Sequence, residues 1–164
     1  MSTPLHIFVG ITIASVLTPS GASPLEAQRL LWFSIFSANL PDLDMIYMGP
    51  KRKNHRLYSV FHFPLFWIAL TPLIAFLFHT FPLPKEYALA LFWGLVSHFF
   101  FDTLDTSGGI RLFAPFDHRQ YSFLKKINNA DTIRDIISGY FKKTVKYEAV
   151  TALICSGILT FLRH

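Results

Sequence analysis

Hydrophobic residues gather into five stretches, and the polar connections between them contain most of the charge. The stretches are residues 5–17, 25–40, 57–81, 87–101 and 149–162. None of them shows a sustained alternation of apolar and polar positions, which would mark a half-buried strand. The pattern therefore predicts an all-α fold.

The lengths of these stretches bear on how the chain meets a membrane. Only residues 57–81 exceed the roughly 20 residues that span a bilayer comfortably, and Pro64 and Pro72 predict a kink there. The four shorter stretches predict tilting, local thinning of the bilayer or entry into one leaflet. We therefore expect a polytopic membrane bundle of about four to five apolar helices. A helical domain that is only partly embedded in one leaflet is the alternative.

Composition strengthens the membrane interpretation. The 164 residues are 52% hydrophobic and 15% charged, with 18 phenylalanines, whereas an average soluble domain is about 25% charged. This length suits one domain, which we divide into a core with the site (1–116), a basic cytoplasmic loop (117–146) and a C-terminal helix (147–164). The single Cys155 excludes an internal disulfide and a Cys-rich zinc site, and its apolar neighbours predict a buried packing role.

Charge predicts an orientation. Basic residues concentrate in two connections, residues 42–56 and 106–146. Two helices separate these connections, so both lie on one side of the membrane, and the positive-inside rule assigns that side to the cytoplasm. The net charge of +5 lies in loops and not in a stripe. We therefore expect contact with anionic membrane lipid and no nucleic-acid partner.

This orientation also collects histidines and aspartates at the cytoplasmic ends of the helices, although no histidine was used to derive it. His98 and Asp102 lie one helical turn apart, a spacing that can hold one metal ion. The other polar side chains at this end are His6, Asp42, Asp44, His55, Arg56 and His62. We infer a metal site that faces the cytoplasm.

The donor types narrow the chemistry. Imidazole and carboxylate ligands without thiolate suit Zn²⁺, Mn²⁺ or Fe. Two or three histidines with one or two aspartates leave a coordination position for water, whose pKa the metal lowers toward 7. An aspartate that bridges two ions would suit a phosphoester, and Arg56 or Arg119 could hold a phosphate oxygen. Serine-based hydrolysis is less favoured, because no Gly-x-Ser-x-Gly motif is present.

Each candidate also has a structural interpretation. His98 and Asp102 could form a hydrogen-bonded pair inside a bundle, Asp42 and Asp44 could be turn and cap residues, and His62 could be a core histidine. The rival function is a non-enzymatic scaffold or transporter with a structural metal site. A closed set of four protein ligands would indicate a structural site, whereas an open position toward a polar cleft would indicate catalysis.

Five short motifs occur in a characteristic order. They are His6 with Gly10, Leu40-Pro41-Asp42-Leu43-Asp44, His55-Arg56, Ser97-His98 with Asp102, and Ala114-Pro115-Phe116. In this order they resemble the YdjM family, small bacterial inner-membrane proteins described as membrane-bound metal-dependent hydrolases. The resemblance covers residues 6–116 and implies a multi-pass protein of the bacterial inner membrane.

The same order is similar to that of zinc-dependent phospholipase C and the P1-type nucleases, which are all-α enzymes. This similarity implies one ion held by Asp42 or Asp44, His55 or His62, His98 and Asp102, with Asp102 and His6 reaching a second ion. It implies one or two ions, preferably Zn²⁺, and a small phosphoester or a lipid headgroup as substrate. The expected metal ligands are His6, Asp42, His55, His62, His98 and Asp102, and the expected catalytic residues are Asp44 and Arg56.

Overall fold

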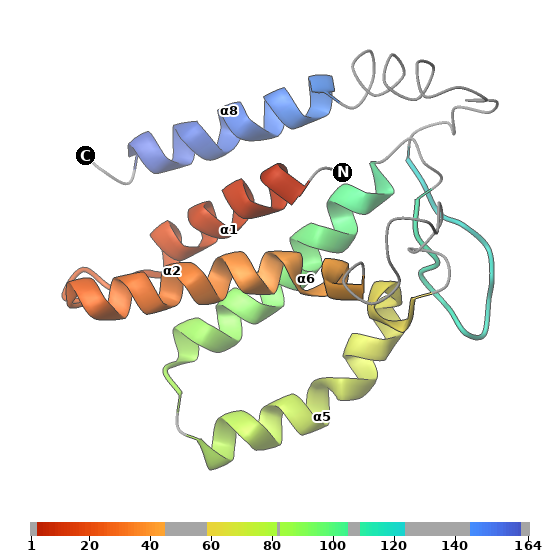
Figure 1. Ribbon diagram of the computed structural model, residues 1–164, viewed down its shortest axis with the longest axis horizontal. Helices are drawn as coiled ribbons and strands as arrows, with labels where there is room; N and C mark the ends of the chain where they lie inside the picture. The colour runs from red at the N-terminus through yellow and green to blue at the C-terminus, as the bar shows by residue number, and fades with distance from the viewer. Residues whose placement is uncertain (1–2, 45–58, 82, 105–108, 124–144, 162–164) are drawn as a thin grey trace.

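The computed structural model describes residues 3–44, 59–81, 83–104, 109–123 and 145–161. The elements are α1 (Thr3–Leu17), α2 (Pro24–Asn39), the 3₁₀ helices η1 (Leu40–Leu43) and η2 (Val60–His62), α5 (Pro64–Thr80), α6 (Lys85–Thr103) and α8 (Val145–Phe161) (Figure 1). The described ranges contain no strand, and a single antiparallel bridge joins Ile110 to Tyr121. The predicted all-α fold with five helices is confirmed.

Helices α1, α2 and α6 form the packed part of the molecule, and α8 lies along α1 (Figure 1). Glycines let these helices approach closely. A Cβ atom added at Gly10 would lie 2.6 Å from the Cα of Ile35, and one added at Gly94 would lie 2.8 Å from the Cβ of Ser37. Small residues at such contacts allow backbones to pack nearly against each other. Gly10 therefore sets the α1–α2 approach, and Gly94 sets the α2–α6 approach.

The contact between α1 and α8 is apolar. Leu5, Val9 and Cys155 form a buried cluster. The thiol thus has the packing role that its apolar neighbours predicted, since an uncharged cysteine behaves as a small hydrophobic residue.

Helix α5 differs from the predicted third helix. It begins at Pro64 and has 17 residues, so the expectation of one kinked helix over residues 57–81, long enough to span a bilayer, is wrong. Pro64 occupies the first turn, where a missing N–H leaves no hydrogen bond unmade, and only Pro72 lies inside the helix. No helix in the described ranges is both long and apolar enough to cross a membrane.

Candidate metal centre

Four segments bring six polar side chains to one end of the packed helices. His6 lies in the first turn of α1, and His98 and Asp102 lie in the last two turns of α6. Asp42 lies in η1, Asp44 follows it, and His62 ends η2. Five of these side chains are completely buried, and that of Asp42 is 11% exposed. A group of ionisable side chains buried this deeply is costly unless they satisfy one another or bind an ion.

Local sequence signals place the two 3₁₀ helices. Pro41 has no backbone N–H to continue the hydrogen bonds of α2, so the helix ends before it and the chain passes into η1. In η2, the hydroxyl of Ser59 accepts a hydrogen bond from the backbone N–H of Phe61 at 3.2 Å. The indole N–H of Trp67 donates to the carbonyl of Phe61 at 2.8 Å and ties η2 to α5. These two hydrogen bonds fix the backbone of Phe61, the residue before His62 in η2.

The ligand atoms are spaced as a single ion requires. The Nε2 atom of His62 lies 3.2 Å from Oδ1 of Asp42 and 3.7 Å from Oδ2 of Asp102. The Nε2 atom of His98 lies 3.8 Å and 3.4 Å from the same two oxygens. Bonds of about 2.0–2.1 Å to a tetrahedral Zn²⁺ place neighbouring ligand atoms about 3.3–3.4 Å apart. The four histidine–aspartate separations are close to this value, and Asp42, His62 and His98 together could hold one ion.

Both central imidazoles have a partner behind the ring. The Nδ1 atom of His98 lies 2.8 Å from the carbonyl oxygen of Ala38 and donates to it. The Nδ1 atom of His62 lies 3.0 Å from Oδ2 of Asp44. Such carbonyl or carboxylate partners fix the tautomer of metal-binding histidines and leave Nε2 for the ion. Sequence reasoning missed the carbonyl of Ala38, because a backbone partner has no side-chain signal.

Buried nitrogens also indicate a missing partner. Within the described part of the chain, Nε2 of His98 and both ring nitrogens of His6 have no hydrogen-bond partner, although they are buried. A buried polar atom without a partner costs about 1–3 kcal/mol. A bound ion would supply partners, so the residues fit the metal that the sequence implied.

His6 extends the centre beyond one ion. Its ring stacks on that of His98 with centroids 4.1 Å apart, and its Nε2 lies 4.0 Å from Oδ1 of Asp102. Asp102 therefore directs one oxygen toward His6 and the other toward His62 and His98. The potential ligand groups are His6, His98 and Asp102, and Asp42, His62 and His98. A carboxylate that faces both groups is placed as a bridging ligand would be.

Electrostatic interactions favour the charged forms of Asp42 and His62. Burial raises the pKa of Asp42, but the hydrogen bond from His62 and the nearby His98 outweigh it and bring the pKa to about 2. Burial lowers the pKa of His62, but hydrogen bonds to Asp42 and Asp44 outweigh it, so the pKa of this imidazole is raised. In the metal-free protein these hydrogen bonds favour the protonated form of His62.

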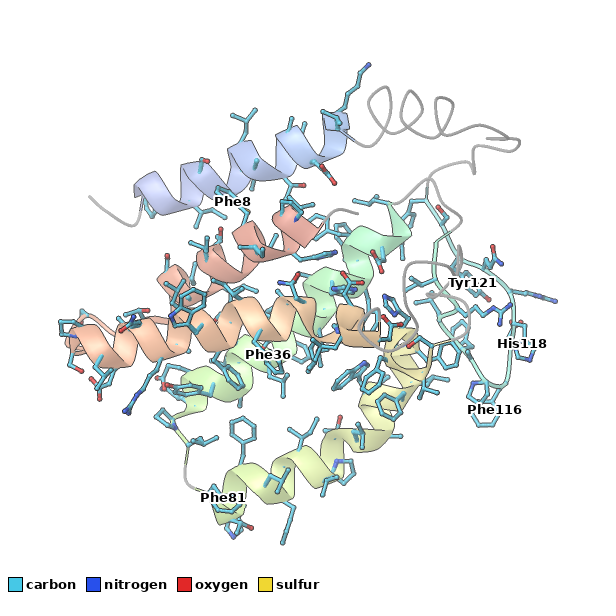
Figure 2. The ribbon with its side chains drawn as sticks, in the orientation of Figure 1. Phe8, Phe36, Phe81, Phe116, His118 and Tyr121 are labelled. Atoms are coloured by element: carbon cyan, nitrogen blue, oxygen red, sulfur yellow. The ribbon has the colours of Figure 1, made fainter. Side chains whose placement is uncertain are left out.

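The sequence offered three further candidates, His55, Arg56 and Arg119. His55 and Arg56 fall outside the described residues. Arg119 is 83% exposed and lies 3.9 Å from a carboxylate oxygen of Asp117. Figure 2 shows His118 on the outer edge of residues 109–123. Of the alternatives that sequence left open, the structure brings His62 to the four-atom cluster and places Asp44 behind it.

Residues 109–123 hold the end of α6 that carries Asp102. The carbonyl of Thr103 accepts hydrogen bonds from the backbone of Phe123 at 2.8 Å and the hydroxyl of Ser122 at 3.1 Å. Gly109 has φ of 74°, and a side chain there would collide with the carbonyl of Tyr121. Glycine is therefore required where this segment pairs with itself.

Comparison with known proteins agrees with the membrane features of the sequence. The sequence model of the YdjM inner membrane protein family matches residues 1–163. The match therefore extends beyond the motifs at residues 6–116 and includes the basic connection and α8. No curated protein and no solved structure matches the chain. The similarity to phospholipase C and P1-type nucleases therefore stays a prediction. The chain belongs to the YdjM family of inner membrane proteins.

Proposed function

We propose that this protein is a membrane-associated, metal-dependent hydrolase that acts on a phosphoester. The observation that carries the proposal is the cluster of His62, His98, Asp42 and Asp102, in which each histidine Nε2 lies 3.2–3.8 Å from an oxygen of both aspartates. His6 beside this cluster supports a second ion. The family supports the inner membrane as the location, and the basic connections favour several passes with the centre on the cytoplasmic side.

Each side chain of the proposed centre has a distinct role. A bound divalent ion would lower the pKa of a water molecule toward 7 and polarise a phosphoryl oxygen. His62 and His98 present Nε2, while Asp44 and the carbonyl of Ala38 orient the two rings. Asp42 is the one partly exposed member, so we expect substrate to approach from its side. The buried remainder excludes bulk water and strengthens electrostatic interactions.

Zinc is the ion that we favour. The donors are imidazole nitrogens and carboxylate oxygens, and their spacing matches tetrahedral bonds of about 2.0–2.1 Å.

A structural metal site is the second candidate function, because one observation favours it. The cluster offers four protein ligand atoms and is nearly closed to solvent, as structural zinc sites are. Such an ion would join η1, η2 and α6.

Elemental analysis combined with hydrolysis assays tests the proposal. We expect about one or two equivalents of Zn²⁺ in the purified protein, and hydrolysis of bis-p-nitrophenyl phosphate that a chelator abolishes and Zn²⁺ restores. His98→Ala should lose metal and activity, whereas His79→Ala, at an exposed position on α5, should keep both. Metal without hydrolysis, together with unfolding on chelation, would establish the structural alternative. Absence of metal with an unchanged His98→Ala variant would contradict both.

A further inference from the structure

An apolar groove of about 390 Å³ lies between α5 and α6. Its volume is within the range of about 300–1,000 Å³ that is usual for ligand sites. Helix α5 contributes Trp67, Thr71 and Ile74 to its wall, and α6 contributes Leu91, Leu95 and Phe99. No residue of α5 is buried by the rest of the described chain, so the described residues leave this groove open.

Among the described residues, the two polar side chains of the groove wall already use their hydrogen-bond donors within the chain. The hydroxyl of Thr71 donates to the carbonyl of Trp67 at 3.2 Å, and the indole N–H of Trp67 donates to the carbonyl of Phe61 at 2.8 Å. The other side chains in the wall are hydrocarbon. A ligand with polar groups along its length would lose their water partners without compensation. A hydrocarbon chain has no such penalty.

The length of the groove matches one membrane leaflet. Its wall on α5 runs from Pro64 to Ile74, which corresponds to about 15 Å at 1.5 Å per residue. The hydrocarbon core of a bilayer is about 30 Å thick, so one leaflet accounts for about 15 Å. This is the depth that one acyl chain of a membrane lipid fills.

One end of the groove lies near the metal centre on both helices. Pro64 lies two residues after His62, and Phe99 follows His98, with ring centroids 5.9 Å apart. From this end the groove follows α5 in the direction of Phe81, which Figure 2 shows at the far end of the helix. A lipid chain in the groove would therefore place its headgroup beside the metal centre.

We propose that the α5–α6 groove binds one acyl chain of a membrane phospholipid whose phosphoester lies at the metal centre. The acyl site rests on the groove itself, and the hydrolytic step rests on the function proposed above. In that step the oxygen of water forms a bond to phosphorus and one P–O ester bond breaks. A proton of the water passes to the leaving oxygen, so the products are an alcohol and a phosphomonoester.

Photo-crosslinking tests the acyl site independently of catalysis. The full chain in detergent is labelled with phosphatidylglycerol that carries a diazirine in one acyl chain, and labelled peptides are mapped. We expect saturable labelling of the groove wall on α5 and α6, reduced at least fivefold by Thr71→Trp, which fills the groove. Leu73→Trp is the matched control, because Leu73 is 52% exposed and lies outside the groove, and it should label as the unchanged protein does.

Substrate length separates failure of this proposal from failure of the hydrolase proposal. Thr71→Trp should lower the ratio of kcat/KM for phosphatidylglycerol to that for bis-p-nitrophenyl phosphate at least tenfold, and Leu73→Trp should leave the ratio unchanged. Saturable groove labelling without any hydrolysis would support the acyl site and contradict the hydrolase. Labelling that does not saturate or is equal in both variants would overturn the acyl site. A disulfide-linked dimer of the Ile68→Cys variant that prevents labelling would also overturn the acyl site, because a second copy of the chain would then fill the groove.

Discussion

Two sides of α6 differ in the kind of residue that they bury or expose. The side toward α2 carries Ala90, Gly94, His98 and Asp102 at intervals of four residues, and all are buried. Another side carries large apolar residues that the described chain leaves exposed, namely Phe92, Trp93, Val96 and Phe100. On these two sides, α6 buries His98 and Asp102 and exposes aromatic residues, the reverse of a soluble helix.

The difference shows how the polar side is built. The small residues Ala90 and Gly94 let α6 approach α2, and His98, one turn further on, then reaches the carbonyl of Ala38. Close backbone packing thereby positions a metal ligand, and a metal ion would compensate for burying it. The apolar side needs no partner from the chain if lipid covers it, which agrees with membership of an inner-membrane family.

Removal of Asp102 should have the largest effect, because one of its carboxylate oxygens lies near His6 and the other near His62 and His98. We expect Asp102→Ala to lower metal content below about a tenth of an equivalent and activity more than about 100-fold, since loss of a residue that binds the ion directly should exceed the 10–100-fold effect of losing a partner behind a ligand. Elemental analysis and the phosphoester assay measure both. Asp117→Asn, on the loop beside Arg119, is the control. Full metal retention in Asp102→Ala would show that Asp102 is not a metal ligand.

Asp44 tests whether the partner behind His62 matters. We expect Asp44→Ala to weaken Zn²⁺ binding about 10–100-fold, because the imidazole loses the carboxylate that orients it. Asp44→Asn should recover part of this loss, because its amide oxygen still accepts from Nδ1. Competition with a fluorescent zinc indicator measures the affinities. Equal affinities for Asp44→Ala and the unchanged protein would show that Asp44 does not act through His62.

Gly94 tests whether helix approach positions the centre. An added methyl group would lie 2.8 Å from Ser37, so Gly94→Ala should lower the free energy of unfolding by about 1–3 kcal/mol and weaken metal binding. Gly157→Ala is the matched control on α8, because no atom lies within 4 Å of an added methyl group. It should raise stability by up to about 1 kcal/mol. Thermal unfolding with and without Zn²⁺ distinguishes the two, and a neutral Gly94→Ala would contradict the close approach.

Acid should release the metal, because protons and the ion compete for imidazole nitrogen. Hydrogen bonds raise the pKa of His62 in the metal-free protein, so competition there should begin above the ordinary histidine value of about 6.5. Below that pKa the affinity should fall about tenfold per pH unit for each imidazole that must lose a proton. Zinc retention between pH 8 and pH 5 measures this loss. An affinity that stays constant over this range would argue against histidine ligands.

The exposed apolar side should give the smallest change. We expect Leu73→Ala, at an exposed position on α5, to alter the free energy of unfolding in detergent by less than about 0.5 kcal/mol. Leu30→Ala, at a position on α2 that is only 3% exposed, should cost about 2–5 kcal/mol. Denaturant titration compares the two. Equal losses would mean that α5 packs against protein in solution.

The amino-acid sequence by itself determined the helices and the candidate ligands. Hydrophobic stretches, Pro41 and the His98–Asp102 spacing act over one or two turns, so they can be interpreted without coordinates. The start of α5 was missed, because apolar residues continue before Pro64 and hide the helix boundary. Family membership extends over residues 1–163, further than the motifs alone indicated.

Only the tertiary structure decided which atoms meet. The distinct places of Asp42 and Asp44 depend on how η1 and η2 face each other, and the carbonyl behind His98 depends on the α2–α6 approach at Gly94. The groove depends on the separation of α5 from α6, which no local pattern encodes. Periodicity fixes which residues share a helix face, but contacts between helices arise from packing among residues far apart in the chain.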